Sequence, residues 1–467
     1  MKRLTRLPGR MASRLLPFRR ASRAQAQRDA LPAFAVPAGA IETLPDPAAY
    51  RARLLAEIAA AERRIVIVAL YLEDDDGGRE VLDALYAAKA RQPALEIAVF
   101  VDWHRAQRGL IGKARSEGNA GMYRAWARER GDGVAIYGVP VQSRELFGVL
   151  HLKGMVIDDA VLYSGASLNN VYLARHGRYR LDRYHLLRHA PLADAMVEYV
   201  QRVFLGSTAV ARLNVPLVPS TPSLLPAIRT LRQQLAVAQY AVPHDEVPGA
   251  DDVAVTPLAG FGRTDNTLND TLLALLASAR ERVVLLTPYF NLPRPVRAAI
   301  GLLLRRGCTV EIMVGDKVAN DFYIPPGEPF RTIGVLPYLY ESNLRRFARV
   351  HQKHLASGQL VLHLWKHADN SFHLKGLFID HDVAVLTGNN LNPRAWALDL
   401  ENALVLHDPH GHLRAQHAAE WAALRRHATR LRDHHALDTV RDYPAPVRKL
   451  LRRLKGVRLD RLANRLL

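Results

Sequence analysis

Two copies of one short motif carry the residues best suited to chemistry. The sequence reads HLKGMVID over 151–158 and HLKGLFID over 373–380, so both segments have the pattern H-x-K-x4-D. Residues two apart in a β-strand point to the same side, so each histidine should face the same cleft as its lysine. The apolar run that follows should form a buried strand ending at the aspartate. The predicted catalytic residues are His151, Lys153, Asp158, His373, Lys375 and Asp380.

Histidine and lysine in this arrangement suit chemistry on a phosphodiester. A lysine ammonium group is a compact positive charge for a non-bridging phosphate oxygen. A neutral imidazole can attack phosphorus, and a second, protonated imidazole can donate a proton to the leaving oxygen. We expect no metal ion and no other cofactor, because lysines and amides already supply the positive potential. One such motif arises often by chance, but two at matching places indicate a functional site.

Each motif is followed by further polar residues. The sequence has GASLN at 165–169 and GNNLN at 388–392. An acid lies 31 residues after His151 and another lies 28 residues after His373. We expect each acid to accept the Nδ1 proton of the histidine that it follows, which leaves Nε2 free for chemistry. The candidates for binding phosphate or orienting a histidine are Ser167, Asn169, Asp182, Asn389, Asn392 and Glu401.

The motifs lie within an internal repeat that predicts the fold. A helix and strand pattern at 52–72 returns at 267–292, and another at 80–103 returns at 295–316. Short apolar runs rich in Val and Ile alternate with helical stretches, which is typical of sheets covered by helices. The sequence therefore predicts an α/β protein with two related lobes.

The length and composition predict the domain boundaries. A chain of 467 residues corresponds to two or three domains. A stretch rich in Pro and acidic residues, with a short helical piece at 226–240, marks a linker. We expect a basic N-terminal segment at 1–30, an N-terminal catalytic lobe at 31–214, the linker at 215–250, a C-terminal catalytic lobe at 251–424 and a basic helical tail at 425–467.

Positive charge is concentrated at the two ends of the chain. The net charge is +19, with nine basic residues and one acid in 1–30, and thirteen basic residues and four acids in 425–467. Basic ends on a nearly neutral body indicate a polyanionic partner, a membrane surface or a nucleic acid.

The single cysteine, Cys308, excludes an intramolecular disulfide framework and fits a cytoplasmic protein. The pattern predicts no transmembrane helix and no secretory signal, with an Arg-rich targeting presequence as the alternative for the N-terminus.

The last segment, VRKLLRRLKGVRLDRLANRLL at 447–467, predicts a basic amphipathic helix. Its leucine stripe could lie in a bilayer interface while the basic side chains reach the lipid headgroups. The alternative is that the leucines pack on the catalytic body and the basic groups are only solvated. Residues 1–30 either assist membrane binding or are disordered. The candidate membrane-binding residues are Arg448, Lys449, Leu450, Leu451, Arg452, Arg453, Leu454, Lys455 and Arg458.

The paired motifs resemble those of the phospholipase D superfamily. Longer segments are similar to its phosphatidylserine synthase branch, and the similarity covers about residues 40–467. These segments include VDWHRAQRGLIG at 101–112, YGVPVQSRELFGVLHLKG at 137–154, VGDKVANDFYIP at 314–325 and GNNLNPRAWALDLENALVLHDP at 388–409. Both lobes read G-x-x-L-N where the wider superfamily has G-S-x-N, and this departure agrees with the synthase branch.

The resemblance implies two lobes of mixed sheet flanked by helices and related by a pseudo-twofold axis. It also implies transfer of a phosphatidyl group from CDP-diacylglycerol to L-serine, with release of CMP, through a phosphatidyl-histidine intermediate in phospholipid biosynthesis. By analogy, His151 is the nucleophile and His373 is the acid and base, although the pseudo-symmetry leaves the reverse order open. We expect the protein to lie peripherally on the anionic inner face of the cell membrane, with nucleic acid not a substrate.

Polar residues at the ends of two predicted strands are candidates for substrate binding. The carboxyl ends of strands line the ligand crevice in α/β sheets, and DWHR at 102–105 and DK at 316–317 occupy such ends. These groups would bind the cytidine or its second phosphate, or would only stabilise loops. An arginine beside Asp182 would hold the serine carboxylate as a bidentate fork, or would belong to a packed strand. The substrate-binding candidates are His104, Arg105, Arg180, Arg183, Lys317, Asn320 and Asp321.

Two other activities are alternatives at this point. A phospholipase D or a cardiolipin synthase-like enzyme would keep the same histidines but use water or a glycerol lipid, and the segments at 101–112 and 314–325 argue against it. A nuclease would use the basic ends for nucleic acid, but the body between them is almost neutral and shows no aromatic and basic binding array.

Overall fold

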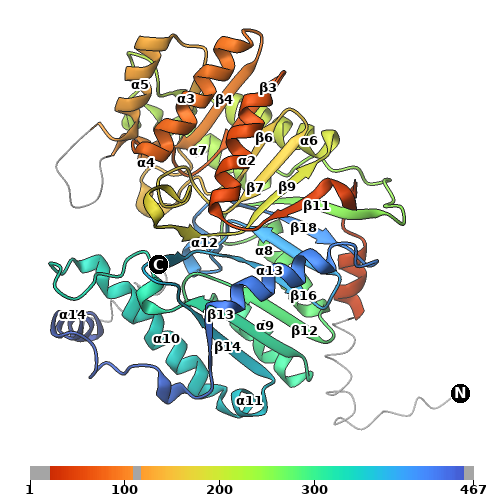
Figure 1. Ribbon diagram of the computed structural model, residues 1–467, viewed down its shortest axis with the longest axis vertical. Helices are drawn as coiled ribbons and strands as arrows, with labels where there is room; N and C mark the ends of the chain where they lie inside the picture. The colour runs from red at the N-terminus through yellow and green to blue at the C-terminus, as the bar shows by residue number, and fades with distance from the viewer. Residues whose placement is uncertain (1–21, 109–116, 457–467) are drawn as a thin grey trace, which may run out of the picture.

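Two lobes, each built on one large sheet, are stacked along the long axis of the molecule (Figure 1). The computed structural model describes residues 22–108 and 117–456. The N-terminal sheet has the order β10 (Ala211–Arg212), β5 (Ala135–Val139), β4 (Glu96–Asp102), β3 (Arg64–Val68), β6 (Gly154–Ile157), β7 (Ala160–Ser164), β9 (Tyr184–Arg188) and β2 (Ile41–Leu44). The C-terminal sheet has the order β1 (Phe34–Pro37), β11 (Asp252–Gly260), β18 (Glu401–His407), β17 (Val383–Thr387), β16 (Gly376–Ile379), β12 (Arg282–Leu286), β13 (Thr309–Gly315), β14 (Leu360–Trp365) and β19 (Ala428–Leu431).

The two sheets repeat one topology. In the N-terminal sheet, β3 and β5 run parallel to β4, whereas β6 runs antiparallel to β3. In the C-terminal sheet, β12 and β14 run parallel to β13, whereas β16 runs antiparallel to β12. The predicted α/β fold with two related lobes of mixed sheet is therefore confirmed.

Helices cover both sheets, and their starting points repeat as well. Asp46 accepts a hydrogen bond from the N–H of Ala49 (2.8 Å), and Asn266 accepts one from Asn269 (3.1 Å). These side chains satisfy free N–H groups at the first turn, so α2 and α8 begin at matching places in the repeat. The helices of the N-terminal lobe are α2 (Pro47–Ala60), α3 (Asp76–Arg91), α4 (Trp103–Gln107), α5 (Asn119–Arg130), α6 (Ala190–Val200) and α7 (Thr221–Val237). Those of the C-terminal lobe are α8 (Thr267–Ser278), α9 (Arg294–Arg305), α10 (Leu336–Val350), α11 (Gln352–Ser357), α12 (Pro393–Ala397), α13 (Arg414–Arg426) and α14 (Ala445–Gly456).

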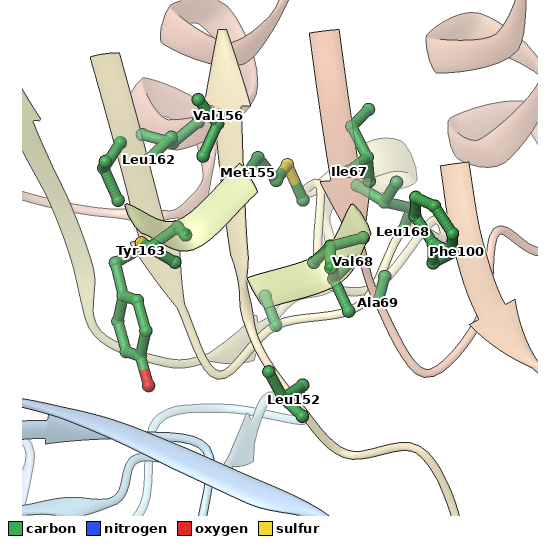
Figure 2. Close-up of a cluster of buried hydrophobic side chains, with 14 of the residues drawn as sticks. Ile67, Val68, Ala69, Phe100, Leu152, Met155, Val156, Leu162, Tyr163 and Leu168 are labelled. Carbon is green, nitrogen blue, oxygen red and sulfur yellow. The ribbon is translucent and has the colours of Figure 1, made fainter. Parts of the chain in front are cut away.

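Apolar packing holds each motif strand in place. All residues of β6 and of β16 are buried. Figure 2 shows Met155 and Val156 of β6 among side chains of the flanking strands β3 and β7, with Leu152 below them next to the C-terminal lobe. Each large apolar side chain buried in this way contributes about 1.5–3 kcal/mol, so the chain that carries the motif has little freedom to move.

Backbone pairing connects the two lobes directly. The short strands β8 (Arg180–Leu181) and β15 (Ser371–Phe372) form a parallel pair across the interface. A bridge between Leu150 and Leu400 repeats this pairing on the other side. The segment just before each motif lysine is thus bonded to the opposite lobe.

Several predicted domain boundaries are wrong. β1 pairs with β11, so residues 34–37 belong to the C-terminal sheet although we predicted them in the N-terminal lobe. The predicted linker contains the whole of α7, which packs Ile228 and Leu231 into the N-terminal core. The predicted tail contributes β19 to the C-terminal sheet, because β19 pairs with β14. The composition of these segments is typical of linkers or chain ends. Their apolar residues pack on core residues that are distant in the sequence, so this packing could not be predicted from composition.

The basic ends also have structured parts. Residues 22–29 are helical, and Arg28 forms an ion pair with Asp382 (3.1 Å). In α14, Val447 and Leu451 are buried against Tyr443 and α10, and Leu450 packs on the same cluster. The prediction that these leucines face a bilayer is therefore wrong for Leu451, whereas Leu450 is only partly buried. The side chains of Leu454 and Lys455, and all of Arg458, lie outside the described residues.

Within the described ranges, the helices are too short or too polar to cross a bilayer.

Candidate active site

The two motifs meet between the lobes. The backbone of each motif is hydrogen-bonded to a segment of the opposite lobe, and that segment carries an acid. The N–H of His151 donates to the carbonyl of Leu400 (3.0 Å), and the N–H of His373 donates to that of Leu181 (2.8 Å). The next residue after each acceptor is an acid, which the pairing holds beside the histidine. A glycine with positive φ, Gly154 (121°) or Gly376 (145°), then begins each motif strand.

Each histidine pairs with the acid of the opposite lobe. The Nδ1 atom of His151 lies 2.9 Å from both carboxylate oxygens of Glu401. The Nδ1 atom of His373 lies 3.3 Å from Oδ2 of Asp182. The prediction that each acid pairs with the histidine that it follows is wrong. The orienting role itself agrees with this geometry, because a carboxylate at Nδ1 leaves Nε2 to face the cleft.

The lysines also reach across the interface. Lys375 donates to Oδ2 of Asp182 (2.7 Å) and contacts His373. The ammonium group of Lys153 is buried and has no hydrogen-bond partner among the described residues. A buried ammonium group without a partner is costly, so this atom is the strongest candidate in the site for a phosphate oxygen.

The glycine of each G-x-x-L-N segment makes room for the opposite lysine. A Cβ atom on Gly388 would stand 2.7 Å from Cγ of Lys153. A Cβ atom on Gly165 would stand 2.9 Å from Nζ of Lys375 and 2.8 Å from the carboxylate of Asp182. The close approach explains why both segments begin with glycine.

Burial and positive charge set the protonation of the site. Burial and the charge of Lys153 hold the pKa of His151 well below its usual value. Burial and the charge of Lys375 lower the pKa of His373 to about 4. Burial and Lys375 also lower the pKa of Lys153 to about 7. Both imidazoles are therefore neutral at pH 7 in the free site, as a nucleophile requires.

The two acids differ in their electrostatics. Burial and the neighbouring Asp399 raise the pKa of Glu401 well above its usual value. Burial would also raise the pKa of Asp182, but the charge of Lys375 and the contact with His373 hold it below its usual value. The two halves of the site are thus similar in geometry and different in charge.

The two motif aspartates lie away from the cleft. Asp158 comes seven residues after His151, roughly 20 Å further along the extended chain, and its carboxylate accepts backbone N–H bonds from residues 62–64 (2.8–3.1 Å). Asp380 accepts the same set of bonds from residues 280–282. The predicted catalytic role of both aspartates is therefore wrong, and they fix the start of β3 and β12.

We expect Asp158→Ala to destabilise the protein by about 1–3 kcal/mol, because three backbone N–H groups lose a charged acceptor. Chemical denaturation would measure this change. The matched control is Asp159→Ala, which removes a half-exposed neighbour and for which less than about 1 kcal/mol is expected. Turnover by the folded fraction should stay close to that of the parent protein. A loss of turnover as large as that caused by replacing a motif histidine would show that Asp158 has a catalytic role.

Most other polar residues after the motifs shape loops. Asn169 donates to Glu73 (2.7 Å), and Asn392 accepts from the N–H of Ala395 (2.8 Å) at the start of α12. These contacts stabilise the loops, and the role of the two asparagines as donors to a phosphate stays a prediction. Asn389 is buried, and its Nδ2 has no partner among the described residues. This amide can therefore donate to a phosphate. Ser167 is buried, and its binding of phosphate stays a prediction.

Four of the predicted substrate-binding residues have other partners. Lys317 pairs with Glu341 (3.2 Å) and also contacts Asp438, and Arg183 pairs with Glu420 (2.6 Å). His104 contacts the carbonyl of Gln142 (2.8 Å), and Asn320 accepts from the N–H of Phe322 (2.9 Å). Structural contacts occupy part of the hydrogen-bonding capacity of these four side chains, and their binding of substrate stays a prediction.

The other three candidates lie on the side of the cleft near His373. Nε of Arg180 is 2.9 Å from Oδ1 of Asp321, and Oδ2 of Asp321 is 3.8 Å from Nε2 of His373. The guanidinium of Arg105 lies over the ring of Tyr71, 5.0 Å from its centroid. The structure therefore brings Arg180 and Asp321 to a reacting group.

Two supporting residues, Asn402 and Tyr172, were not predicted from the sequence. The side chain of Asn402 accepts from the N–H of Lys153 (2.9 Å) and donates to its carbonyl (2.8 Å). It also accepts from the hydroxyl of Tyr163 (3.1 Å), the side chain whose oxygen points toward the C-terminal lobe in Figure 2. The hydroxyl of Tyr172 lies 2.9 Å from Nδ1 of His373. Asn402 directly follows Glu401, so its place in the repeat was a usable signal.

Comparisons with known proteins agree with this two-lobed site. Residues 272–424 match the family described as cardiolipin synthase, PLD-like domain. The chain is 50% identical over 422 residues to CDP-diacylglycerol–serine O-phosphatidyltransferase from Escherichia coli, covering 90% of this chain and 93% of that protein. It is 44% identical over 449 residues to the enzyme of the same name from Haemophilus influenzae, covering 95% and 98%. The crystal structure of phosphatidylserine synthase from Haemophilus influenzae aligns with a TM-score of 0.92 and 43% identity, over 96% of this chain and 100% of that chain.

Proposed function

The chain belongs to the family of CDP-diacylglycerol–serine O-phosphatidyltransferases, and we propose that it performs the family's reaction through a phosphatidyl-histidine intermediate formed between its lobes. The enzyme transfers a phosphatidyl group from CDP-diacylglycerol to L-serine and releases CMP. The observation that carries the mechanism is the convergence of two cross-lobe pairs, His151 with Glu401 and His373 with Asp182.

The first half-reaction breaks the bond between CMP and the phosphatidyl group. Nε2 of His151 attacks the phosphorus that bears diacylglycerol, and Glu401 stabilises the positive charge that forms on the imidazole. The ammonium group of Lys153 and the amide of Asn389 bind the non-bridging oxygens. The pyrophosphate raises the pKa of His373 from its low value in the free site, so this histidine can protonate the departing CMP.

The second half-reaction reverses these roles. His373, now neutral, accepts the proton of the serine hydroxyl, and the hydroxyl oxygen attacks the phosphatidyl-histidine. The bond from phosphorus to Nε2 of His151 breaks, and phosphatidylserine leaves. Two in-line displacements at one phosphorus retain its configuration overall.

The structure favours His151 as the nucleophile. Among the described residues, its Nδ1 contacts only the two oxygens of Glu401, as suits an imidazole that must carry a covalent group at Nε2. His373 has Asp182, Tyr172 and Lys375 around Nδ1 and has Asp321 near Nε2, which suits a group that exchanges protons. This order agrees with the one expected by analogy.

Incubation with labelled CDP-diacylglycerol tests the function. We expect phosphatidylserine and CMP to form together and in a serine-dependent manner. Phosphatidic acid as the main product with serine present would indicate a hydrolytic phospholipase D. Cardiolipin or phosphatidylglycerol made with glycerol lipids, and no phosphatidylserine, would indicate the cardiolipin synthase-like alternative.

We further propose that the protein binds anionic membranes peripherally on the cytoplasmic side, where its lipid substrate lies. Lys449, Arg452 and Arg453 of α14 are exposed, whereas the apolar side of the same helix packs on the body. That apolar cluster continues to Tyr289, whose hydroxyl binds Asp321 at the cleft. Membrane contact at α14 therefore puts the lipid surface on the side of the molecule where the cleft lies.

We expect the triple variant Lys449→Glu, Arg452→Glu and Arg453→Glu to bind anionic vesicles at least about 100-fold more weakly, because each basic residue near such a surface contributes about 1 kcal/mol. Vesicle sedimentation with phosphatidylglycerol at low and high salt measures this. Arg229→Glu with Arg232→Glu, on the exposed side of α7, is the matched control. Unchanged binding by the triple variant would show that α14 is not the anchor.

A further inference from the structure

A partly buried ion pair of Arg180 and Asp321 lies next to the histidine that activates the acceptor. Arg180 comes from β8 of the N-terminal lobe, and Asp321 comes from the loop after β13 of the C-terminal lobe. The pair is therefore complete only where the lobes meet. We propose that it is the binding site for the amino acid acceptor, in which Asp321 binds the α-ammonium group of serine and Arg180 binds the α-carboxylate. This inference rests on the proposed function and names the part of the site that selects serine.

Both charged groups have hydrogen-bonding capacity left for a ligand. Among the described residues, the guanidinium of Arg180 forms one ion pair, through Nε, and lies over the ring of Tyr172, 4.9 Å from its centroid. Its two terminal nitrogens keep four N–H donors in the planar fork that matches a carboxylate. Oδ2 of Asp321 accepts from the hydroxyl of Tyr289 (2.8 Å), and each oxygen keeps a lone pair for an ammonium group.

The mixed charge of the pair selects the class of ligand. A phosphate would meet the carboxylate of Asp321, so the predicted role of this residue with the cytidine phosphates does not fit its position. A zwitterion places opposite charges against both partners. Tyr71, Tyr172 and Tyr289 are buried around the pair, and in such surroundings an unmatched charge is costly. Water and glycerol lack both charges, so they cannot form ion pairs with Arg180 and Asp321.

The position of the pair also fits the chemistry of serine. Oδ2 of Asp321 lies 3.8 Å from Nε2 of His373, the atom that accepts the hydroxyl proton. In serine, the carbon that bears the hydroxyl is bonded to the carbon that bears both charged groups. An ammonium group bound to Asp321 therefore brings the hydroxyl within reach of Nε2.

Two measurements on the full chain test this proposal. The first is the KM for L-serine at saturating CDP-diacylglycerol. The second is the exchange of labelled CMP into CDP-diacylglycerol without serine, which reports the first half-reaction. We expect Arg180→Ala to raise the KM for serine by about 10–100-fold, as for a lost bidentate contact, and to slow CMP exchange by a clearly smaller factor. Asp321→Asn should also raise the KM for serine.

Controls separate this role from a structural one. Arg178→Ala removes an exposed arginine two residues away, which donates to the carbonyl of Asp369, and should leave both measurements unchanged. Arg180→Gln serves if Arg180→Ala does not fold. A KM for serine within twofold of the parent value, or equal losses in serine use and CMP exchange, would overturn the proposal. CMP exchange without any phosphatidylserine from the parent enzyme would instead refute the proposed function.

Discussion

His373→Ala is expected to form a phosphatidyl-enzyme from CDP-diacylglycerol and to stall there, whereas His151→Ala is expected to form none. The nucleophile makes the covalent bond, so its removal abolishes both half-reactions. The acid and base assists the departure of CMP and is needed to activate serine, and each such contribution amounts to about 10²–10⁴-fold. Both variants should therefore lose at least about 10³-fold in overall turnover.

Quenching in denaturing detergent at mildly alkaline pH after incubation with lipid-labelled CDP-diacylglycerol preserves the intermediate, because a phosphorus–nitrogen bond to histidine is stable in base and labile in acid. Later treatment with acid should release the label. His176→Ala, which removes an exposed histidine, is the matched control. Label that survives in His151→Ala and is lost in His373→Ala would reverse the order of the two histidines. Label in neither variant would favour direct transfer without a covalent step.

The second large effect follows from the cross-lobe pairing of acids and histidines. Glu401→Gln should slow formation of the phosphatidyl-enzyme by about 10²–10⁴-fold, because an amide no longer fixes the tautomer of His151 or stabilises its positive charge. Asp182→Asn should act mainly on the serine step, because Asp182 contacts His373 and Lys375.

Rapid-quench measurements distinguish the two variants. CMP release and phosphatidylserine formation are each measured as a function of time. Glu328→Gln, an exposed acid of the C-terminal lobe, is the control. If Asp182→Asn impairs phosphatidyl-enzyme formation more than Glu401→Gln does, then the acids act within their own lobes and the pairing derived from the structure fails.

The repeat in the sequence was sufficient to predict the fold and to identify the reacting groups. Matching apolar runs predicted two related sheets, and paired motifs predicted two histidines and two lysines facing one cleft. These features are local, because the side-chain direction in a strand depends only on its period of two residues. The expected family also followed from contiguous motifs.

Partnerships across the interface could not be predicted in this way. Glu401 lies 250 residues from His151 along the chain, and Asp182 lies 191 residues from His373. Spacing suggested the nearer histidine for each acid. The parallel pairing of β8 with β15 instead brings Asp182 to His373, and the bridge between Leu150 and Leu400 brings Glu401 to His151. The same is true of Lys317 and Arg183, whose ion-pair partners lie on other elements.

The sequence by itself thus determined which groups do the chemistry, because residue type and strand period are properties of short segments. Only the tertiary structure decided which acid orients which histidine, where Arg180 and Asp321 meet, and that the motif aspartates hold backbone N–H groups away from the cleft. Hydrogen bonds and ion pairs form over about 3–4 Å, so they depend on how the two lobes dock and not on distance along the chain.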